Sequence, residues 1–139
     1  ISDWLTVSEN ITNGILKKDK ELILNGLDIL IYSILANIPY DWLNKNPEGW
    51  LKTMIGVAIS MKNTYYSAEN QNIIGRTDLH IAKDDTAFVV EVKVDSNAEE
   101  CIEQIEKKYE QSYQNYFKEI VKIGVNWDRE KKEIDVMIK

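Results

Sequence analysis

The sequence predicts an α/β fold, with a mixed β-sheet flanked by helices and a helical extension at the N-terminus. Apolar residues recur at helical spacing up to Met61, and the pattern then changes to short runs of β-favouring residues. A single later stretch with helical spacing divides these runs into a group of three and a group of two. The order of helices, three strands, one helix and two strands is typical of a sheet with helices packed against it.

The N-terminal part contains three predicted helices. The first covers Ser8–Lys17, and Asp19 is a suitable N-cap for the second, which Pro39 ends. Asn46 followed by Pro47 is typical of a helix start with proline in the first turn. The third helix then places apolar residues at helical spacing, namely Trp50, Leu51, Met54, Ile55, Ala58 and Met61.

Two of the next three strands are predicted to form a hairpin. Ile73–Ala82 and Ala87–Val94 are rich in β-favouring residues, and the polar tetrad Lys83–Thr86 between them has turn composition. An extended segment, Thr64–Glu69, precedes the pair. The first three strands are therefore consecutive in the chain.

One helix separates this hairpin from the last two strands. Ser96 and Glu99 have the spacing of a capping box, and the helix is expected to persist to about Tyr109. Ile120–Val125 has the apolar, β-branched composition of a buried strand, and Glu133–Ile138 follows it after a turn. The helix carries one apolar stripe, formed by Ala98, Cys101, Ile102 and Ile105.

The net charge of −6 limits the ways in which this chain could bind nucleic acid. Basic grooves bind nucleic acid because Lys and Arg neutralise its phosphates, so an acidic balance disfavours a binder of that kind. Carboxylates that hold divalent cations count as negative in the sequence but present a compensated charge to a ligand. A metal site would therefore reconcile the acidic chain with a nucleic-acid substrate.

Cysteine content and hydropathy exclude several other classes. Cys101 is the only cysteine, so no intrachain disulfide can form and a cysteine-rich zinc site is excluded. No apolar run reaches the roughly 20 residues needed to span a bilayer, and no basic-then-apolar secretion signal opens the chain. We expect no membrane partner. Because the sequence begins at Ile1, the chain could be part of a longer protein with further domains. The sequence does not predict the oligomeric state.

Two charged residues interrupt an otherwise apolar strand. Glu91 and Lys93 lie two residues apart, so strand alternation puts both on one face. A carboxylate inside an apolar strand is costly unless it is paired or binds a metal. Asp78 lies on the preceding strand of the hairpin, where pairing could bring its carboxylate beside Glu91. Two carboxylates and a lysine suit phosphodiester hydrolysis, because the acids hold Mg2+ and the lysine orients water.

A structural role for the same residues stays open at this point. Glu91 and Lys93 could form an ion pair while Asp78 closes a turn, because a Glu-x-Lys triplet alone is common. His80 shares a strand face with Asp78, but a lone strand histidine is more often structural. The acidic residues of the following helix are expected to form its solvated face: Glu99, Glu100, Glu103, Glu106 and Glu110.

Several motifs occur in the order of one known family. They are Gly75–Leu79, Val90–Lys93, Ala98 and Gln104–Ile105, with Ile38–Tyr40, Glu48 and Ile123–Asn126 farther out. Together they resemble the PD-(D/E)XK nuclease domain found at the C-terminus of AAA-ATPase-like bacterial proteins, over about residues 20 to 130. Related domains occur in endosymbiont effectors. The resemblance implies a restriction-endonuclease-like fold.

The resemblance also implies a metal centre. It assigns Asp78 and Glu91 as metal ligands, with the main-chain carbonyl of Val92 as a further ligand. Lys93 takes the position of the catalytic lysine. The implied cofactor is Mg2+ or Mn2+, and the implied substrate is nucleic acid.

Two flanking residues are supporting candidates in the same resemblance. Glu48 would reach the metal from the first core helix through water. Gln104 would approach from the helix after the Glu-x-Lys strand and position phosphate or the lysine. The chain departs from the family pattern at Lys52, where histidine is common, and in the spacing from Gln104 to Tyr109.

These observations lead to one hypothesis and two rivals. The hypothesis is a metal-dependent nuclease acting on DNA in the bacterial cytoplasm, with secretion into a host cell left open. It forms one domain over residues 1–139, with N-terminal helices over 1–38 and the nuclease core over 39–139. The first rival is a catalytically silent nuclease-fold module that binds a protein or nucleic acid. The second is a non-nuclease module for oligomerisation or partner binding, which would show a large exposed apolar patch.

Overall fold

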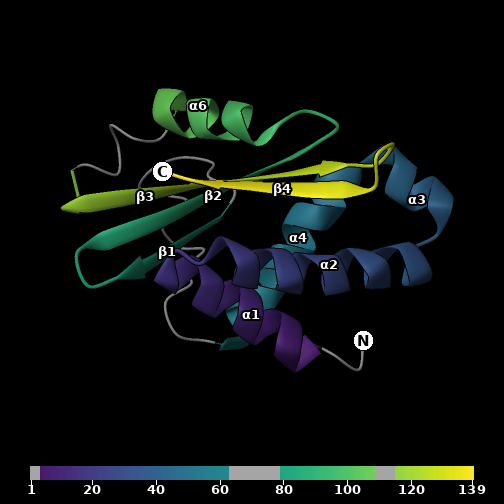
Figure 1. Cartoon of the computed structure of the whole chain (residues 1–139), viewed down its shortest axis with the longest axis horizontal. Helices are drawn as coiled ribbons and strands as arrows, with labels where there is room; N and C mark the ends of the chain where they lie inside the picture. The colour runs from purple at the N-terminus through teal and green to yellow at the C-terminus, as the bar shows by residue number, and fades with distance from the viewer. Residues whose placement is uncertain (1–3, 63–78, 109–114) are drawn as a thin grey trace. The chain divides into compact units, whose positions relative to one another are not determined.

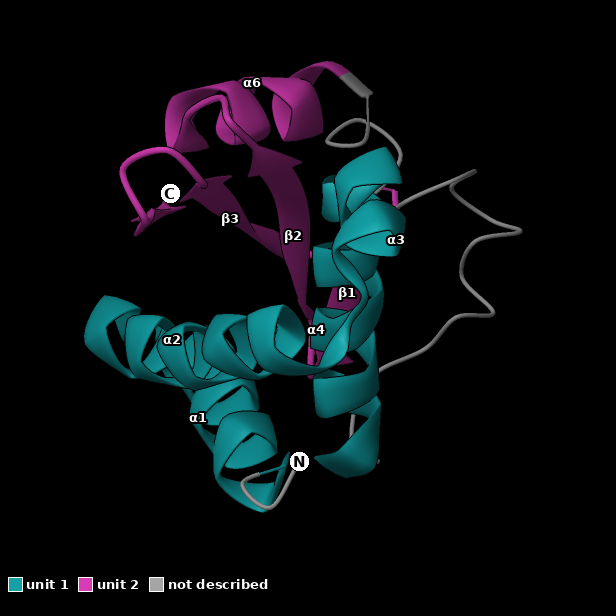
Figure 2. Ribbon diagram, turned by 90° about the vertical axis from the view of Figure 1, so that its right-hand side faces the viewer, with its two compact units in different colours: residues 1–63 teal, residues 64–139 magenta. Residues whose placement is uncertain are grey.

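The computed structural model describes residues 4–62, 79–108 and 115–139. The chain divides into two compact units, residues 1–63 and 64–139 (Figure 2). Helices alone form the described part of the first unit, and the second contains a β-sheet with one helix. The N-terminal helical extension is thereby confirmed, whereas one domain with its core starting at residue 39 stays a prediction.

Helix α1 organises the first unit by packing against two others. The four helices of this unit are α1 (Trp4–Lys17), α2 (Lys20–Asn37), α3 (Tyr40–Lys45) and α4 (Pro47–Lys62). Helices α1 and α2 approach closely at Gly26, where an added Cβ would lie 2.8 Å from the Ile11 side chain. Ser8 ties α1 to α4, because its Oγ donates to the carbonyl of Ala58 at 2.5 Å.

The helix boundaries of this unit follow their capping residues. Asp19 accepts a hydrogen bond from the backbone N–H of Leu22 at 3.2 Å, which confirms it as the N-cap of α2. Asn46 accepts from the N–H of Gly49 at 3.0 Å, and α4 begins at Pro47 as predicted. Two expectations were incomplete. Helix α1 begins at Trp4, before the predicted Ser8, and the short helix α3 was not predicted at all.

The second unit is a four-stranded mixed sheet, which confirms the predicted fold class. Its strands are β1 (Leu79–Lys83), β2 (Thr86–Val94), β3 (Glu119–Asp128) and β4 (Glu133–Ile138), in spatial order β1-β2-β3-β4. Strand β2 is antiparallel to β1 and parallel to β3, and β4 is antiparallel to β3. Helix α6 (Ala98–Lys108) connects the parallel pair and lies along one face of the sheet (Figure 1).

The predicted turns and strands of this unit are largely confirmed. Lys83 pairs with Thr86 across the β1–β2 turn, where Asp84 has a φ of 55°. Strand β4 has the predicted bounds, and β3 extends beyond the predicted Ile120–Val125 at both ends. Of the predicted strand Ile73–Ala82, residues 73–78 lie outside the described part of the chain. The segment Thr64–Glu69 lies outside it as well.

The predicted capping box of α6 was wrong. The N-cap is Asn97, whose Oδ1 accepts from the backbone N–H of Glu100 at 2.9 Å. Ser96 lies one residue earlier, and its hydroxyl pairs with the Glu100 side chain at 2.5 Å instead of capping the helix. Serine and asparagine cap helices about equally well, so residue preference alone does not favour Ser96 over its neighbour Asn97.

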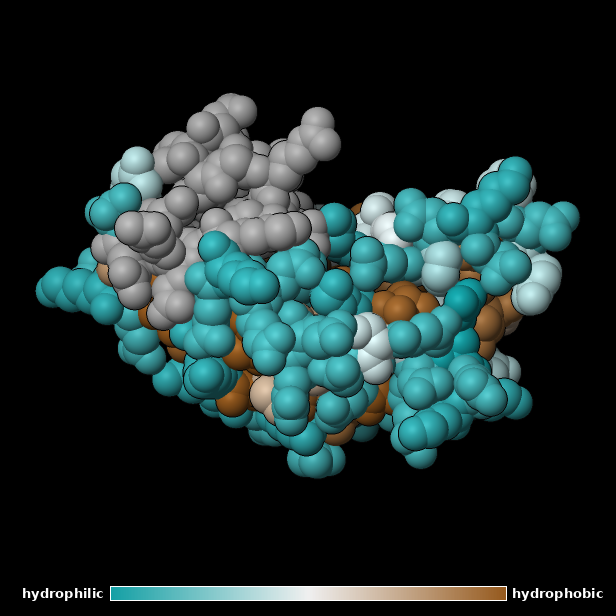
Figure 3. Space-filling model, turned by 90° about the horizontal axis from the view of Figure 1, so that it is seen from above, coloured by the Kyte–Doolittle hydropathy of each residue, from teal (hydrophilic) through white to brown (hydrophobic). Residues whose placement is uncertain are grey.

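The outward side of α6 is hydrophilic, and among the described residues the predicted solvated acidic face has one exception; Glu110 lies outside the described part of the chain. Glu99, Glu100 and Glu103 are exposed, and hydrophilic residues cover most of the surface seen from above (Figure 3). Glu106 instead turns towards the sheet, where Lys122 Nζ lies 3.0 Å and Lys139 Nζ 3.2 Å from its Oε2. Hydrogen bonds from these lysines lower the pKa of Glu106. None of the described helices is long and apolar enough to cross a membrane.

Gly124 on β3 is required for the close packing of α6. A Cβ at this position would lie 2.5 Å from the carbonyl oxygen of Ala98 and 2.8 Å from the Cβ of Cys101. We expect Gly124→Ala to lower the free energy of unfolding by about 1–3 kcal/mol in urea titrations, because the helix must move away. Adding Cys101→Ala should not restore stability, since alanine keeps the Cβ of Cys101 and the backbone carbonyl of Ala98 remains. Recovery in that double variant would contradict the expected clash with these two atoms.

Candidate active site

Strand β2 presents both charged residues of the Glu-x-Lys triplet on the face covered by α6. Ala87 and Val89 of this strand pack against Ile105 of the helix, and strand alternation puts Glu91 and Lys93 on that same face. The Glu91 residue is only 3% exposed, whereas Lys93 is half-buried. A buried carboxylate and a lysine with partial access to solvent therefore lie side by side along one strand face.

Helix α6 supplies a hydrogen-bond donor to the buried carboxylate. Gln104 Nε2 donates to Glu91 Oε1 at 3.0 Å. An ionised carboxylate only accepts hydrogen bonds, so the amide nitrogen of Gln104 must face it. The predicted role of Gln104, to position phosphate or the lysine, stays a prediction. In the structure its amide contacts the carboxylate of Glu91, the candidate metal ligand.

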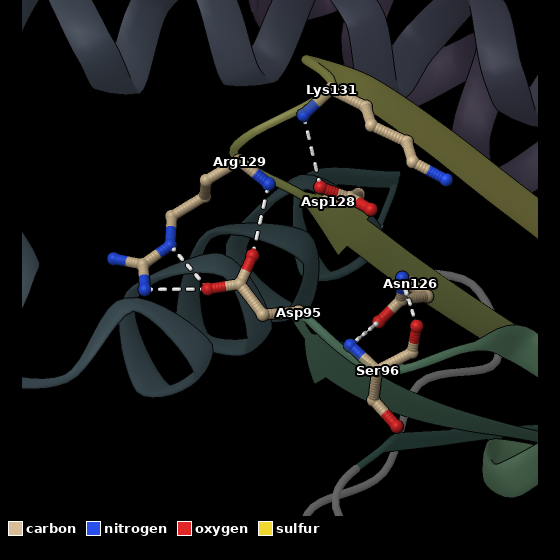
Figure 4. A network of polar contacts seen from close by, with 6 residues as sticks. All are labelled: Asp95, Ser96, Asn126, Asp128, Arg129 and Lys131. Carbon is tan, nitrogen blue, oxygen red and sulfur yellow. Dashed lines mark hydrogen bonds and ion pairs between the residues drawn. The ribbon is translucent and has the colours of Figure 1, made fainter.

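Strand β3 lines the same face next to the triplet. Glu91 pairs with Gly124 and Lys93 pairs with Asn126 in the parallel register. Asn126 is 4% exposed, and its side chain forms two hydrogen bonds with the backbone of Ser96 (Figure 4). The N–H of Ser96 donates to Asn126 Oδ1 at 3.0 Å, and Asn126 Nδ2 donates to the Ser96 carbonyl at 3.2 Å. We call these two bonds the Asn126–Ser96 pair.

The chain leaves β2 through a second polar contact, made by Asp95. Its φ is 58°, a left-handed conformation that aspartate adopts more readily than most residues. The N–H of Asp95 donates to the Trp127 carbonyl at 2.8 Å. Its carboxylate accepts from the N–H, Nε and Nη2 of Arg129 at 2.9, 2.9 and 2.6 Å (Figure 4). The end of β2 is thus attached to the β3–β4 turn.

Arg129 makes the stability supplied by Asp95 depend on pH. Hydrogen bonds from Arg129 hold the pKa of Asp95 below its usual value of about 3.9. The unfolded chain therefore binds this proton first, so the contribution is complete above that value and is lost as the pH falls through the lowered pKa. Asparagine tolerates the same φ, so we expect Asp95→Asn to make the free energy of unfolding, measured in urea titrations, depend less steeply on pH in the acid range. The effect should be on the order of 0.5 kcal/mol, because solvent screens the exposed pair. Parallel pH profiles for the two proteins would contradict this assignment.

His80 lies on the site face of the sheet but is deeply buried. It pairs with Val89 across the β1–β2 ladder and is 2% exposed. Burial lowers the pKa of its imidazole, so the side chain is neutral at physiological pH. These features agree with the structural role that the sequence favoured.

The structure brings together some of the predicted site residues and leaves others apart. Glu91, Val92 and Lys93 are consecutive on β2, and Gln104 contacts the first of them. Asp78 lies outside the described residues. Glu48 is exposed in the first turn of α4, in the other compact unit.

Sequence reasoning missed the residues that secure the end of β2. Asn126 was noted only as part of a strand motif, and neither Asp95 nor Arg129 was singled out. Ser96 and Asn126 are 30 residues apart, and Asp95 and Arg129 are 34 apart. The one available signal was a polar residue, Asn126, directly after the apolar run Ile120–Val125.

The donor chemistry of the site suits a hard divalent cation. Mg2+ and Mn2+ prefer carboxylate and carbonyl oxygens, which Glu91 and the Val92 main chain supply. The competing soft ligand Cys101 is buried, and its Sγ lies 3.4 Å from the Val125 carbonyl. In the part of the chain that the structure describes, no three His, Cys, Asp or Glu side chains converge to hold a metal. The described oxygens are of the kind that these cations prefer, but they do not by themselves make a complete metal site.

A mixed sheet whose inner strand carries a buried glutamate and, two residues later, a lysine agrees with the restriction-endonuclease-like class of folds. The family model of the PD-(D/E)XK nuclease superfamily matches residues 46–136, more than half of the chain. The chain belongs to this superfamily. No curated protein and no solved structure gave a significant match.

Proposed function

We propose that this protein is a metal-dependent nuclease that hydrolyses phosphodiester bonds in DNA. The observation that carries the proposal is the arrangement on β2, where the buried Glu91 and the half-buried Lys93 share one strand face. A cation held at this face would stabilise the buried carboxylate in addition to the hydrogen bond from Gln104. Members of the superfamily are usually nucleases, which makes a polyanionic substrate the natural ligand.

The proposed metal ligands are Asp78, Glu91 and the main-chain carbonyl of Val92. Leu79, the first described residue of β1, pairs with Val90. Asp78 directly precedes Leu79 in the sequence, and we propose it as the second carboxylate beside Glu91. Glu48 is proposed to reach the metal through water from the start of α4.

Each side chain has a separate task in the proposed reaction. Mg2+ or Mn2+, when bound, supplies Lewis-acid stabilisation of the charge on the phosphate. Lys93 donates hydrogen bonds that orient the attacking water and offset negative charge developing on the phosphate oxygens. Gln104 holds the carboxylate of Glu91 in place through its 3.0 Å hydrogen bond.

A cleavage assay tests the proposal directly. Purified protein is incubated with plasmid DNA and with single- and double-stranded oligonucleotides of DNA and RNA, in Mg2+, Mn2+, Ca2+ or EDTA. We expect DNA to be cleaved with Mg2+ or Mn2+ and to stay intact in EDTA. Binding without cleavage under every condition would favour the catalytically silent module. Preferential cleavage of RNA would overturn the assignment of DNA as substrate.

A further inference from the structure

Asn126 is a buried polar residue that the proposed reaction does not use. It stands next to Lys93 in the parallel register and is 4% exposed. Burying an amide is costly unless its hydrogen bonds are satisfied, and the Asn126–Ser96 pair provides one acceptor contact and one donor contact. A single side chain thereby hydrogen-bonds both backbone polar groups of Ser96.

Ser96 occupies the point at which the Glu-x-Lys strand turns into α6. It follows Asp95, whose φ is 58°, and precedes Asn97, the N-cap of the helix. The direction in which α6 leaves the sheet is therefore set at this residue. The Asn126–Ser96 pair fixes that point against β3, while the Asp95 contact with Arg129 fixes the residue before it (Figure 4).

The position of Gln104 depends on the direction of α6. At a rise of 1.5 Å per residue, the six steps from Ala98, the first residue of α6, to Gln104 span about 9 Å of helix. A tilt of about 6° at the helix start would move Gln104 by about 1 Å over that length. Such a shift is enough to break a hydrogen bond of 3.0 Å, since contacts near 3.6 Å no longer qualify.

We propose that Asn126 is a positioning residue of the nuclease site. By holding Ser96 it sets the angle between α6 and β2, and so places Gln104 against Glu91 beside Lys93. The expected effect of Asn126 on catalysis rests on the proposed function. Its structural part, the dependence of the Gln104 contact on Asn126, stands independently of any activity.

Two substitutions at Asn126 separate its hydrogen bonds from its volume. Asn126→Leu keeps a similar size and removes both bonds. Asn126→Asp introduces a carboxyl group that, when protonated, can donate to the Ser96 carbonyl and accept from the Ser96 N–H as the amide does. When ionised, the same group only accepts. The defect of this second variant relative to the native protein should therefore shrink as the pH is lowered.

The primary readout is the side-chain amide of Gln104 in 15N-edited NMR spectra. In Asn126→Leu we expect its hydrogen exchange to accelerate at least tenfold and its resonances to move. In cleavage assays we expect kcat to fall at least tenfold with little change in KM, since a misplacement of about 1 Å can cost two orders of magnitude in rate. For Asn126→Asp, the ratio of variant to native kcat should rise as the pH falls.

The matched control is Lys122→Met. This change removes the 3.0 Å ion pair between Lys122 and Glu106 on the same sheet face, farther along α6. It should lower stability while leaving the Gln104 amide signal and kcat close to native values. Equal effects of Lys122→Met and Asn126→Leu would reduce Asn126 to a general structural role.

The outcomes distinguish this inference from the proposed function. An unchanged Gln104 amide in folded Asn126→Leu overturns the inference, whatever the activity. A native protein that cleaves nothing overturns the proposed function, and the NMR comparison still decides the role of Asn126. If Asn126→Leu does not fold, the pH series of Asn126→Asp decides, and a Gln104 amide that does not change with pH relative to native overturns the inference.

Discussion

Replacing Lys93 with alanine should reduce the rate of DNA cleavage about 100- to 1000-fold while leaving the protein folded and able to bind metal. The magnitude is that of removing one preorganised donor that stabilises transition-state charge. The proposed metal ligands Asp78, Glu91 and Val92 are unchanged by this substitution, so metal affinity should survive. Single-turnover cleavage with saturating Mg2+ measures the chemical step, and calorimetry measures metal binding.

A neighbouring surface lysine provides the control for this substitution. Lys107 is exposed on α6, so Lys107→Ala changes the net charge equally without touching the strand. It should retain native activity. Equal cleavage by native protein and Lys93→Ala would point to a contaminating nuclease and contradict the assignment of Lys93.

The melting temperature separates this catalytic role from a structural one. If Lys93 only neutralised a buried acidic pair, its removal would cost about 3–5 kcal/mol of stability. Within the described residues, Lys93 forms no ion pair. We therefore expect Lys93→Ala to melt close to the native temperature, and a large drop would support the structural role.

The sequence predicts the elements of this fold well wherever a local signal is strong. The hairpin around Lys83–Thr86 and strand β4 follow from turn composition and β-branched runs, which need no knowledge of distant residues. Helix α3 (Tyr40–Lys45) was not predicted because its six residues are too few to show a periodic pattern. Its boundaries depend on Pro39 and Asn46, which were interpreted only as the end and the start of the neighbouring helices.

The candidate site divides in the same way between local and long-range information. Glu91 and Lys93 were predictable because two charges interrupt an apolar strand, and Gln104 came from the family resemblance. The Asn126–Ser96 pair and the contact between Asp95 and Arg129 could not be predicted. Each contact joins segments that are 30 or more residues apart in the sequence. The parallel register that aligns β2 with β3 cannot be predicted from the sequence of either strand alone.

Metal binding should raise the melting temperature of the native protein, and the double variant Asp78→Asn, Glu91→Gln should abolish that rise. A ligand at a hundredfold excess over its Kd stabilises the folded state by about 2.7 kcal/mol. For a chain of this size, that corresponds to an increase in Tm of about 5 to 15 °C. Both substitutions are nearly isosteric, and the amide oxygen introduced by Glu91→Gln can still accept the hydrogen bond from Gln104. The double variant therefore removes charge with little change in packing.

The control for this experiment carries the same loss of charge at a different place. Glu99 and Glu103 are exposed on α6, so Glu99→Gln, Glu103→Gln removes two negative charges away from the strand face. This control and Lys93→Ala should both keep the Mg2+-dependent rise in Tm, because the proposed ligands are intact. An equal rise in the Asp78→Asn, Glu91→Gln variant would place the metal elsewhere. If the native protein shows no rise with either Mg2+ or Mn2+, the result favours the catalytically silent nuclease-fold module.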